Sequence, residues 1–192
     1  YDLVGLKRII VSSYQSVSGS GKDAVDELYK QTEQFLSKAK ISRQVYPHQI
    51  AFNILPHIDY FEDNAFTKEE MKLIHETKKI LGDDKIKITA TAARVPVFIG
   101  HAESVYLETE QHLSISKLKL LYMKTEGIKL VDDIANSKYP LPIMSEVYDD
   151  VMIGRIRKDI ASENGINLWI VANNLRKGAA LNAVQIAELL FL

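Results

Sequence analysis

The chain has 192 residues and a formal net charge of −1, and its composition is 46% hydrophobic and 26% charged. Such a composition is typical of one soluble domain with a sizeable core, and the balanced charge gives no broad field that would attract DNA, RNA or a membrane surface. We find no apolar run as long as a membrane span and no signal peptide, and the complete lack of cysteine excludes disulfides and thiolate chemistry within these residues.

The first half of the chain predicts one strand and two helices. Residues 8–13 are apolar and β-branched, as in a buried strand, and a loop of small residues, 15–21, follows. The next helix has Ser20 as its expected N-cap, and residues 41–65 form an irregular stretch with two prolines. A second helix opens with a capping box at Thr67–Glu70 and ends at Gly82. The apolar face of the first helix is expected to comprise Val25, Leu28, Tyr29, Phe35 and Leu36.

The second half is richer in strands. Period-two alternation and β-branched runs predict strands at 85–91, 95–99, 104–108, 151–157 and 167–172. A helix capped by Ser114 or Ser116 runs to Lys124, and an amphipathic helix covers residues 178–192. Several strands mixed with a few long helices indicate the α+β class, with a mixed sheet covered by helices.

The beginning of the chain predicts that it belongs to a longer polypeptide. Tyr1 is not an initiator methionine, and a strand-like run starts within a few residues. No Gly-x-Gly-x-x-Gly motif follows a strand, so a nucleotide-binding half is expected outside these residues.

Two side chains at strand ends are candidates for chemistry. His101 follows Gly100 between two strand-like runs, and a histidine titrates near neutral pH, although an exposed turn histidine is the simpler alternative. Arg94 stands at a strand end, where it needs either an internal ion pair or an anionic ligand such as a carboxylate. The other four histidines show no metal-ligand spacing, and no metal site is predicted.

Three further groups are ambiguous when considered alone. Glu69 and Lys72 lie three residues apart on one helical face, as ordinary surface ion pairs do. Arg155 and Arg157 alternate along a strand and are interpreted as edge or interface charges. The small-residue loop at 18–21 precedes a helix, where backbone N–H groups can receive a polar ligand.

Four stretches in order resemble the bacterial type of the aspartate-semialdehyde dehydrogenase family. They are IVSSYQSVSGSG at 10–21, IAFNILPHID at 50–59, TATAARVPV with GHAESV at 89–105, and GRIRKD with NLRKGAALN at 154–182. Family members reduce aspartyl phosphate to the semialdehyde with NADPH, on the route to lysine, threonine and methionine. The resemblance implies the plan of glyceraldehyde-phosphate dehydrogenase, in which a nucleotide domain precedes a domain for substrate binding and dimer contacts.

The resemblance also implies roles for individual residues. His101 matches the acid–base histidine, and Gln15 matches the glutamine beside the nucleophile. Arg94 matches the arginine that binds the substrate carboxylate, Glu69 the acid that holds the amino group, and Lys72 a lysine of the phosphate site. The positions expected near the nicotinamide end of NADP are Ser18, Gly19 and Asn174.

The family's nucleophilic cysteine has no counterpart here, so the chain alone is predicted to be inactive. Residues 1–173 are expected to bind substrate and dimerise, and residues 174–192 to form a helix that packs on the nucleotide domain. The resemblance implies a homodimer, and the lack of cysteine fits a cytoplasmic location. The alternatives are an acyl-phosphate reductase of the N-acetylglutamyl-phosphate type, in which an acetylated substrate would not require Glu69, and a non-catalytic dimerisation module.

Overall fold

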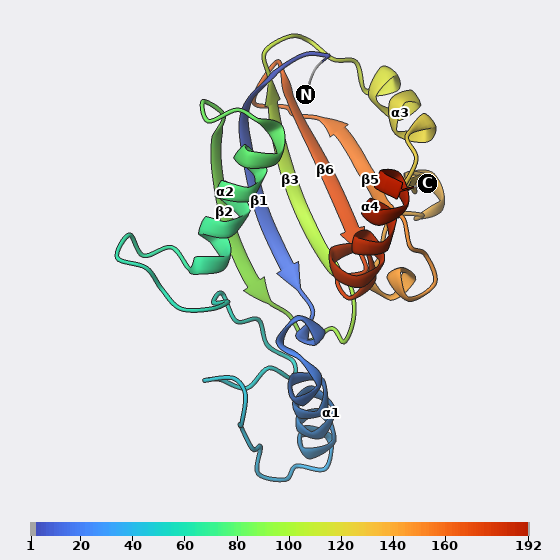
Figure 1. Cartoon of the computed structure of the whole chain (residues 1–192). Coiled ribbons are helices and arrows are strands. Elements are labelled where there is room, and N and C mark those ends of the chain that lie inside the picture. The colour runs from blue at the N-terminus through green and yellow to red at the C-terminus, as the bar shows by residue number, and fades with distance from the viewer. Residues whose placement is uncertain (1–2, 192) are drawn as a thin grey trace.

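The computed structural model describes residues 3–191, which form one mixed sheet and a set of helices (Figure 1). The strands are β1 (Leu6–Gln15), β2 (Lys87–Arg94), β3 (His101–Thr109), β4 (Ile128–Leu130), β5 (Val151–Lys158) and β6 (Gly165–Ala172). The α-helices are α1 (Lys22–Leu36), α2 (Lys68–Leu81), α3 (Ile115–Lys124) and α4 (Leu181–Phe191). This arrangement confirms the α+β prediction.

The strand order in the sheet is β2-β1-β3-β6-β5-β4. The central strand β3 is antiparallel to both of its neighbours, β1 and β6, whereas each outermost strand runs parallel to its neighbour, β2 to β1 and β4 to β5. The carboxyl ends of β1 and β2 therefore meet the amino end of β3 at one edge of the sheet. In Figure 1 this edge lies at the lower end of the sheet, next to the segment that leads into α1.

The two faces of the sheet differ. One face carries the main core, in which Ile9, Val105 and Leu168 pack with Leu81 of α2 and Leu118 of α3. Because side chains alternate along a strand, the opposite face presents the neighbouring residues. There the side chains are mostly polar or only half-buried, and they include Arg8, Ile10, Ser12, Thr89, Ser104, Tyr106, Arg155, Arg157 and Trp169.

The helix α1 forms as predicted, but two of its details were wrong. Its N-cap is Gly21 rather than Ser20, and no side chain caps it, because residues 17–20 form a separate 3-10 turn, η1. Leu28 is buried as expected, whereas Tyr29 and Leu36 are 60% and 72% exposed. The buried stripe instead contains the polar residues Glu27 and Gln31.

Those two polar residues organise the irregular stretch that follows. The Glu27 carboxylate accepts hydrogen bonds from the backbone N–H groups of Gln44 and Val45. The Gln31 amide oxygen accepts from the N–H groups of Ile50 and Ala51, and its nitrogen donates to the carbonyl of Ser42. A loop buried against a helix needs such partners for its backbone. These two side chains therefore provide the hydrogen bonds that a neighbouring strand would otherwise provide.

The predicted strand at 95–99 does not form. Pro96 has no N–H to give to a ladder, and Val97 donates to the carbonyl of Val95 in a tight turn. The carbonyls of Val97 and Phe98 then accept from Val17 and Ser18, which attaches this loop to η1. The segment before His101 is therefore a turn fixed against the end of β1, and β3 starts at His101 itself.

The other predicted elements form, with ends that differ from the prediction, whereas the short strand β4 was not predicted. Thr67 and Glu70 form the predicted capping box of α2, and Ser114 caps α3. The predicted strands at 151–157 and 167–172 pair with each other as β5 and β6. The last helix begins with a π-helical turn, η4 (Arg176–Ala180), before α4, and the predicted end at Leu192 lies outside the described residues.

Candidate functional site

Three of the candidate side chains lie on neighbouring strand ends. Gln15 and Arg94 are the last residues of β1 and β2 and are partners in the parallel register. His101, the first residue of β3, lies one position beyond the Tyr14–Ala102 pair. The sheet therefore places Arg94, Gln15 and His101 in one row, on the face that the helices cover.

His101 is held at one ring nitrogen. Its Nδ1 accepts a hydrogen bond from the backbone N–H of Ser16 at 3.1 Å and lies 3.1 Å from the Ser16 hydroxyl. Burial, with the positive charge of Arg94 as a second cause, lowers the pKa of His101 to about 4, and the backbone of Gly100 opposes this shift. The imidazole is therefore neutral at pH 7, and Nε2 is the nitrogen left for a ligand.

Arg94 is a buried guanidinium without a carboxylate partner. It is only 5% exposed, and its Nη1 donates to the carbonyl of Ser16 at 2.8 Å. Burial lowers its pKa, and the nearby groups of Tyr46 and Glu69 oppose that shift. Within residues 3–191 it forms no salt bridge, so the internal ion-pair alternative fails and its free N–H groups can receive an anionic ligand.

The first turn of α2 brings Glu69 to the same row. The Gln15 amide donates to Glu69 Oε1 at 3.0 Å, and Lys72 Nζ lies 3.9 Å from Glu69 Oε2. The helix is fixed there by Glu70, whose Oε1 accepts from the backbone N–H of Ala92 in β2. Arg94, Gln15, His101 and Glu69 thus form one cluster, and the half-exposed Lys72 lies at its border.

The three residues predicted near the cofactor also lie at this edge. Asn174 Nδ2 donates to Ser18 Oγ at 3.0 Å, and Asn174 Oδ1 accepts from the N–H of Gly100. Gly19 is exposed, and a Cβ at this position would be 2.9 Å from Arg94 Nη1 and 3.4 Å from His101 Nε2. Only a residue without a side chain leaves the space above these two groups open.

Two residues of the cluster were missed by the sequence reasoning. Ser16 contacts both His101 and Arg94, through atoms that no local pattern distinguishes. Glu103 lies two residues after His101 on the same face of β3, and burial, followed by the charge of Glu69, raises its pKa. Period-two spacing from His101 was a usable signal for Glu103; no comparable signal existed for Ser16.

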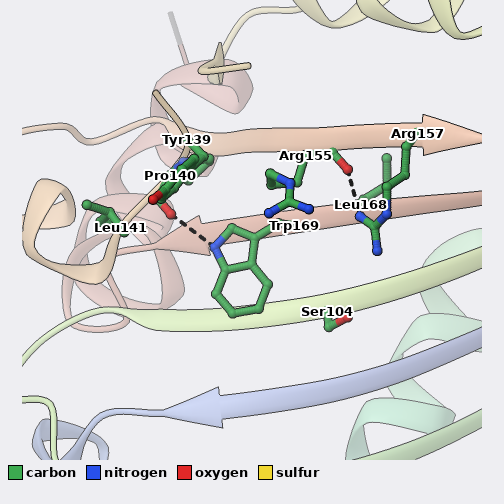
Figure 2. A pocket seen from close by; sticks show the side chains of 8 residues that line it. All are labelled: Ser104, Tyr139, Pro140, Leu141, Arg155, Arg157, Leu168 and Trp169. Carbon is green, nitrogen blue, oxygen red and sulfur yellow. Dashed lines mark hydrogen bonds between the residues drawn. The ribbon is translucent and has the colours of Figure 1, made fainter. Parts of the chain in front are cut away.

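A separate hollow lies on the opposite face of the sheet (Figure 2). It encloses about 340 Å³ and is lined by Ser104, Tyr139, Pro140, Leu141, Arg155, Arg157, Leu168 and Trp169. The Trp169 indole N–H donates to the carbonyl of Pro140 on its border. Trp169 pairs with Ser104, whose side chain points to the face of β3 opposite to that of His101. The hollow is therefore not part of the cluster.

Residues 3–191 contain neither a metal site nor a membrane-spanning helix. No group of three or more histidine, aspartate or glutamate side chains in this part of the chain is arranged to hold a metal ion. None of the helices in this range is long and apolar enough to span a membrane.

The cluster defines a class of protein. A buried arginine without an ion pair and a neutral imidazole at strand ends, with a carboxylate at a helix start, can bind a small amino-acid-like anion beside a proton-transfer group. The chain belongs to the semialdehyde dehydrogenase dimerisation-domain family, whose model matches residues 1–177.

Individual relatives agree with this assignment. The chain is 53% identical over 191 residues to the aspartate-semialdehyde dehydrogenase of Legionella pneumophila. This match covers 99% of the chain and 55% of that protein. It matches the crystal structure of aspartate semialdehyde dehydrogenase II from Vibrio cholerae complexed with ASA with a TM-score of 0.95 and 48% identity, over 99% of this chain and 56% of that one.

A more distant structure shows the same fold. The enzyme of Candida albicans with NADP has a TM-score of 0.68 at 24% identity, over 96% of this chain and 50% of that one. The chain resembles the C-terminal portion of these enzymes and spans about half of their length.

Proposed function

We propose that this chain is the substrate-binding and dimer-forming part of an aspartate-semialdehyde dehydrogenase. The enzyme would reduce aspartyl phosphate to aspartate semialdehyde with release of phosphate. The observation that carries the proposal is the row of Arg94, Gln15 and His101, with Glu69 hydrogen-bonded to Gln15. This row offers one cationic and one anionic group to a substrate that carries both a carboxylate and an ammonium.

Each charged group has a distinct task in this proposal. Arg94 donates two parallel hydrogen bonds to the substrate carboxylate, a geometry that suits a planar guanidinium. Glu69 accepts from the substrate ammonium, and Gln15 orients Glu69 through the 3.0 Å bond. Lys72, whose side chain is 54% exposed, receives the phosphate at the open border of the site.

His101 moves the proton in this scheme. The chain contains no cysteine, so the nucleophilic thiol must come from residues outside it. The imidazole is half-buried, and its Nε2 is not engaged by any hydrogen bond of the described residues, so this atom is the one that exchanges protons with the thiol and with the substrate oxygen.

The residues next to His101 fit a flat cofactor ring. Gly19 is exposed and has no Cβ over His101 Nε2 and Arg94 Nη1, and Ser18 and Asn174 border it. We assign Ser18, Gly19 and Asn174 to the nicotinamide end of NADPH, which supplies a hydride when bound. The alternative, an NAD-dependent enzyme, is tested by supplying NAD in place of NADP in the assay.

The end of the chain has a separate role. We propose that residues 1–173 form the substrate-binding and dimerisation unit and that the helix within 174–192 packs on a nucleotide-binding domain. None of the described residues of α4 is buried, and Leu189, Leu190 and Phe191 are 87%, 71% and 82% exposed. An apolar helix with this exposure requires a covering surface.

The homodimer would form through the face of the sheet opposite to the site. Ile10 and Tyr106 are neighbours on β1 and β3 there, and Arg155 and Arg157 form no salt bridge among residues 3–191. A two-fold interface through this face predicts that Tyr106→Asp yields a monomer in size-exclusion chromatography with light scattering. Arg43→Asp, a charge reversal on the surface near α1, should leave the dimer intact.

The test of the activity uses the complete gene product that contains this chain. Phosphate-dependent reduction of NADP with aspartate semialdehyde should be observed, with N-acetylglutamate semialdehyde as the control substrate. His101→Ala should lower kcat by about 10²- to 10⁴-fold, and Arg94→Ala should mainly raise KM for the semialdehyde. Arg43→Ala, an exposed arginine bound to the Pro47 carbonyl, is the matched control. Turnover of only the acetylated substrate, or no binding of nucleotide, would refute the proposal.

A further inference from the structure

Asn173 lies directly after β6 and uses both ends of its side-chain amide. The residue is 4% exposed, and its Nδ2 donates to the carbonyl of Ser145 at 2.8 Å. Its Oδ1 accepts from the backbone N–H groups of Leu175 and Arg176, each at 3.0 Å. One buried side chain therefore connects the end of β6 to two other segments of the chain.

The bonds to Leu175 and Arg176 hold the first turn of the last helix. A side-chain oxygen that accepts from the N–H groups two and three residues later is the usual cap at a helix start. The backbone carbonyl of Asn173 also accepts from the N–H of Gly178, at 3.1 Å. Both oxygens of Asn173 thus hold the turn in which Asn174 lies.

Asn174 carries the amide that faces the site. Its Nδ2 donates to Ser18 Oγ at 3.0 Å, and its Oδ1 accepts from the N–H of Gly100 at 3.0 Å. These contacts place the amide beside Ser18 and Gly19, the residues assigned above to the nicotinamide end of the cofactor. A rotation of the turn would therefore move this amide relative to the cofactor.

The bond to Ser145 fixes the other side of Asn173. Ser145 is fully buried in the 3-10 turn η3 (Pro142–Glu146), and its hydroxyl donates to the Pro142 carbonyl at 2.7 Å. The same turn packs against Gly100, where a Cβ would clash with Ser145 Oγ and lie 2.8 Å from the Pro142 carbonyl oxygen. The turn η3 therefore supports both Gly100 and Asn173, each of which precedes a residue of the site.

We propose that Asn173 is a positioning residue for the cofactor, which orients the amide of Asn174 at the nicotinamide end by holding the turn at 174–176 against η3. The inference rests on the dehydrogenase function proposed above, and the resemblance assigns no role to Asn173. A residue that served only as a helix cap would contribute to stability and leave cofactor binding unchanged. The two roles therefore differ in what a substitution changes.

The substrate side of the site is held by other contacts. Arg94 donates to the carbonyl of Ser16, and Glu69 accepts from the amide of Gln15. Both of these contacts come from the end of β1 and not from Asn173. Loss of the Asn173 amide should therefore change the kinetic parameters for the cofactor and leave KM for the semialdehyde near its wild-type value.

The kinetic test uses Asn173→Ala and Asn173→Asp in the complete gene product. Asn173→Ala removes all three side-chain bonds and should raise KM for NADP by about three- to tenfold, with KM for aspartate semialdehyde within about twofold of wild type. Asn173→Asp keeps acceptors for the N–H groups of Leu175 and Arg176 and should raise KM for NADP less than Asn173→Ala does. Ser114→Ala is the matched control, because it removes the cap of a different helix, α3, and should lower stability without raising KM for NADP.

Nucleotide binding separates this inference from the proposed function. NADP and 2′,5′-ADP share the adenosine 2′-phosphate portion, and only NADP carries a nicotinamide. In calorimetric titrations Asn173→Ala should weaken the binding of NADP by about three- to tenfold and leave that of 2′,5′-ADP unchanged. If the wild type binds NADP but does not turn over the semialdehyde, the proposed function fails while this comparison still decides the role of Asn173.

Two results would overturn the role of Asn173. The first is a wild-type Kd and KM for NADP in Asn173→Ala, even with a lower unfolding midpoint, because the residue would then be only a helix cap. The second is an equal loss of affinity for NADP and 2′,5′-ADP, because the change would then not concern the nicotinamide end. Should Asn173→Ala fail to fold, Asn173→Asp decides in the same titrations, since it keeps the cap and loses the bond to Ser145.

Discussion

The carboxylate of Glu70 connects α2 to the sheet, and its removal is expected to be costly. Glu70 Oε2 accepts from the backbone N–H of Thr67 at 2.8 Å, and Oε1 accepts from the N–H of Ala92 at 2.9 Å. All three residues are at most 8% exposed. Glu70→Ala removes a helix cap, worth about 1 kcal/mol, and leaves a buried N–H in β2 without a partner, at about 1–3 kcal/mol. The free energy of unfolding should therefore fall by about 2–4 kcal/mol.

The assay is urea unfolding of the chain followed by the fluorescence of Trp169, the single tryptophan. Glu70→Gln keeps one acceptor oxygen and should lose about half as much. Glu76→Ala, an exposed glutamate on the same helix, should change the free energy by less than about 0.5 kcal/mol. If the free energy of unfolding of Glu70→Ala lies within about 0.5 kcal/mol of the wild-type value, Glu70 does not connect the helix to the sheet and the reasoning fails.

Three further outcomes test other parts of the structure. Gly19→Ala should lower kcat/KM, because its Cβ would lie 2.9 Å from Arg94 Nη1, and wild-type kinetics would contradict this. The unfolding midpoint should not change, because Gly19 lies on an exposed turn. Gly154→Ala should cost about 1–3 kcal/mol of stability in urea unfolding, since its Cβ would lie 2.1 Å from the carbonyl oxygen of Val131. The pKa of His101 is about 4 in the folded chain and near 6.5 when unfolded, so the unfolded state binds the extra proton between these values. The free energy of unfolding should therefore fall by about 3 kcal/mol as pH decreases from 6.5 to 4, and His101→Gln should remove that part of the pH dependence.

The parts of the fold that were predicted correctly depend on neighbours in sequence. The capping box of α2 needs only Thr67 and Glu70, three residues apart, and alternation along residues 85–91 needs only its own side chains. The strand predicted at 95–99 was wrong because the prediction used only the apolar content of these residues and did not consider which strand they could pair with. Val95 donates its N–H to the carbonyl of Gln15, and Pro96 then ends the pairing. The three-residue strand β4 is too short to give a periodic signal.

The site could be predicted only in part, for the same reason. The resemblance selected Arg94, His101, Gln15 and Glu69, and the structure brings these four together; their chemical roles stay predictions. Ser16 could not be found from sequence, because its partner His101 is 85 residues away and the small residues around Ser16 are common before helices. A contact at that separation depends on strand order, which local patterns do not contain.

The junction of β1 and η1 has a consequence for how the site can change. The N–H of Ser16 binds His101, and the carbonyl of the same residue binds Arg94, so one residue fixes the proton-transfer group and the carboxylate-binding group together. A shift at this junction would move both side chains at once, whereas a change at Glu69 or Lys72 leaves both contacts of Ser16 in place. Substitutions that loosen the junction should therefore affect kcat and KM together. Substitution of Glu69 should mainly affect KM for the amino-bearing substrate, because Glu69 contacts Gln15 and not His101.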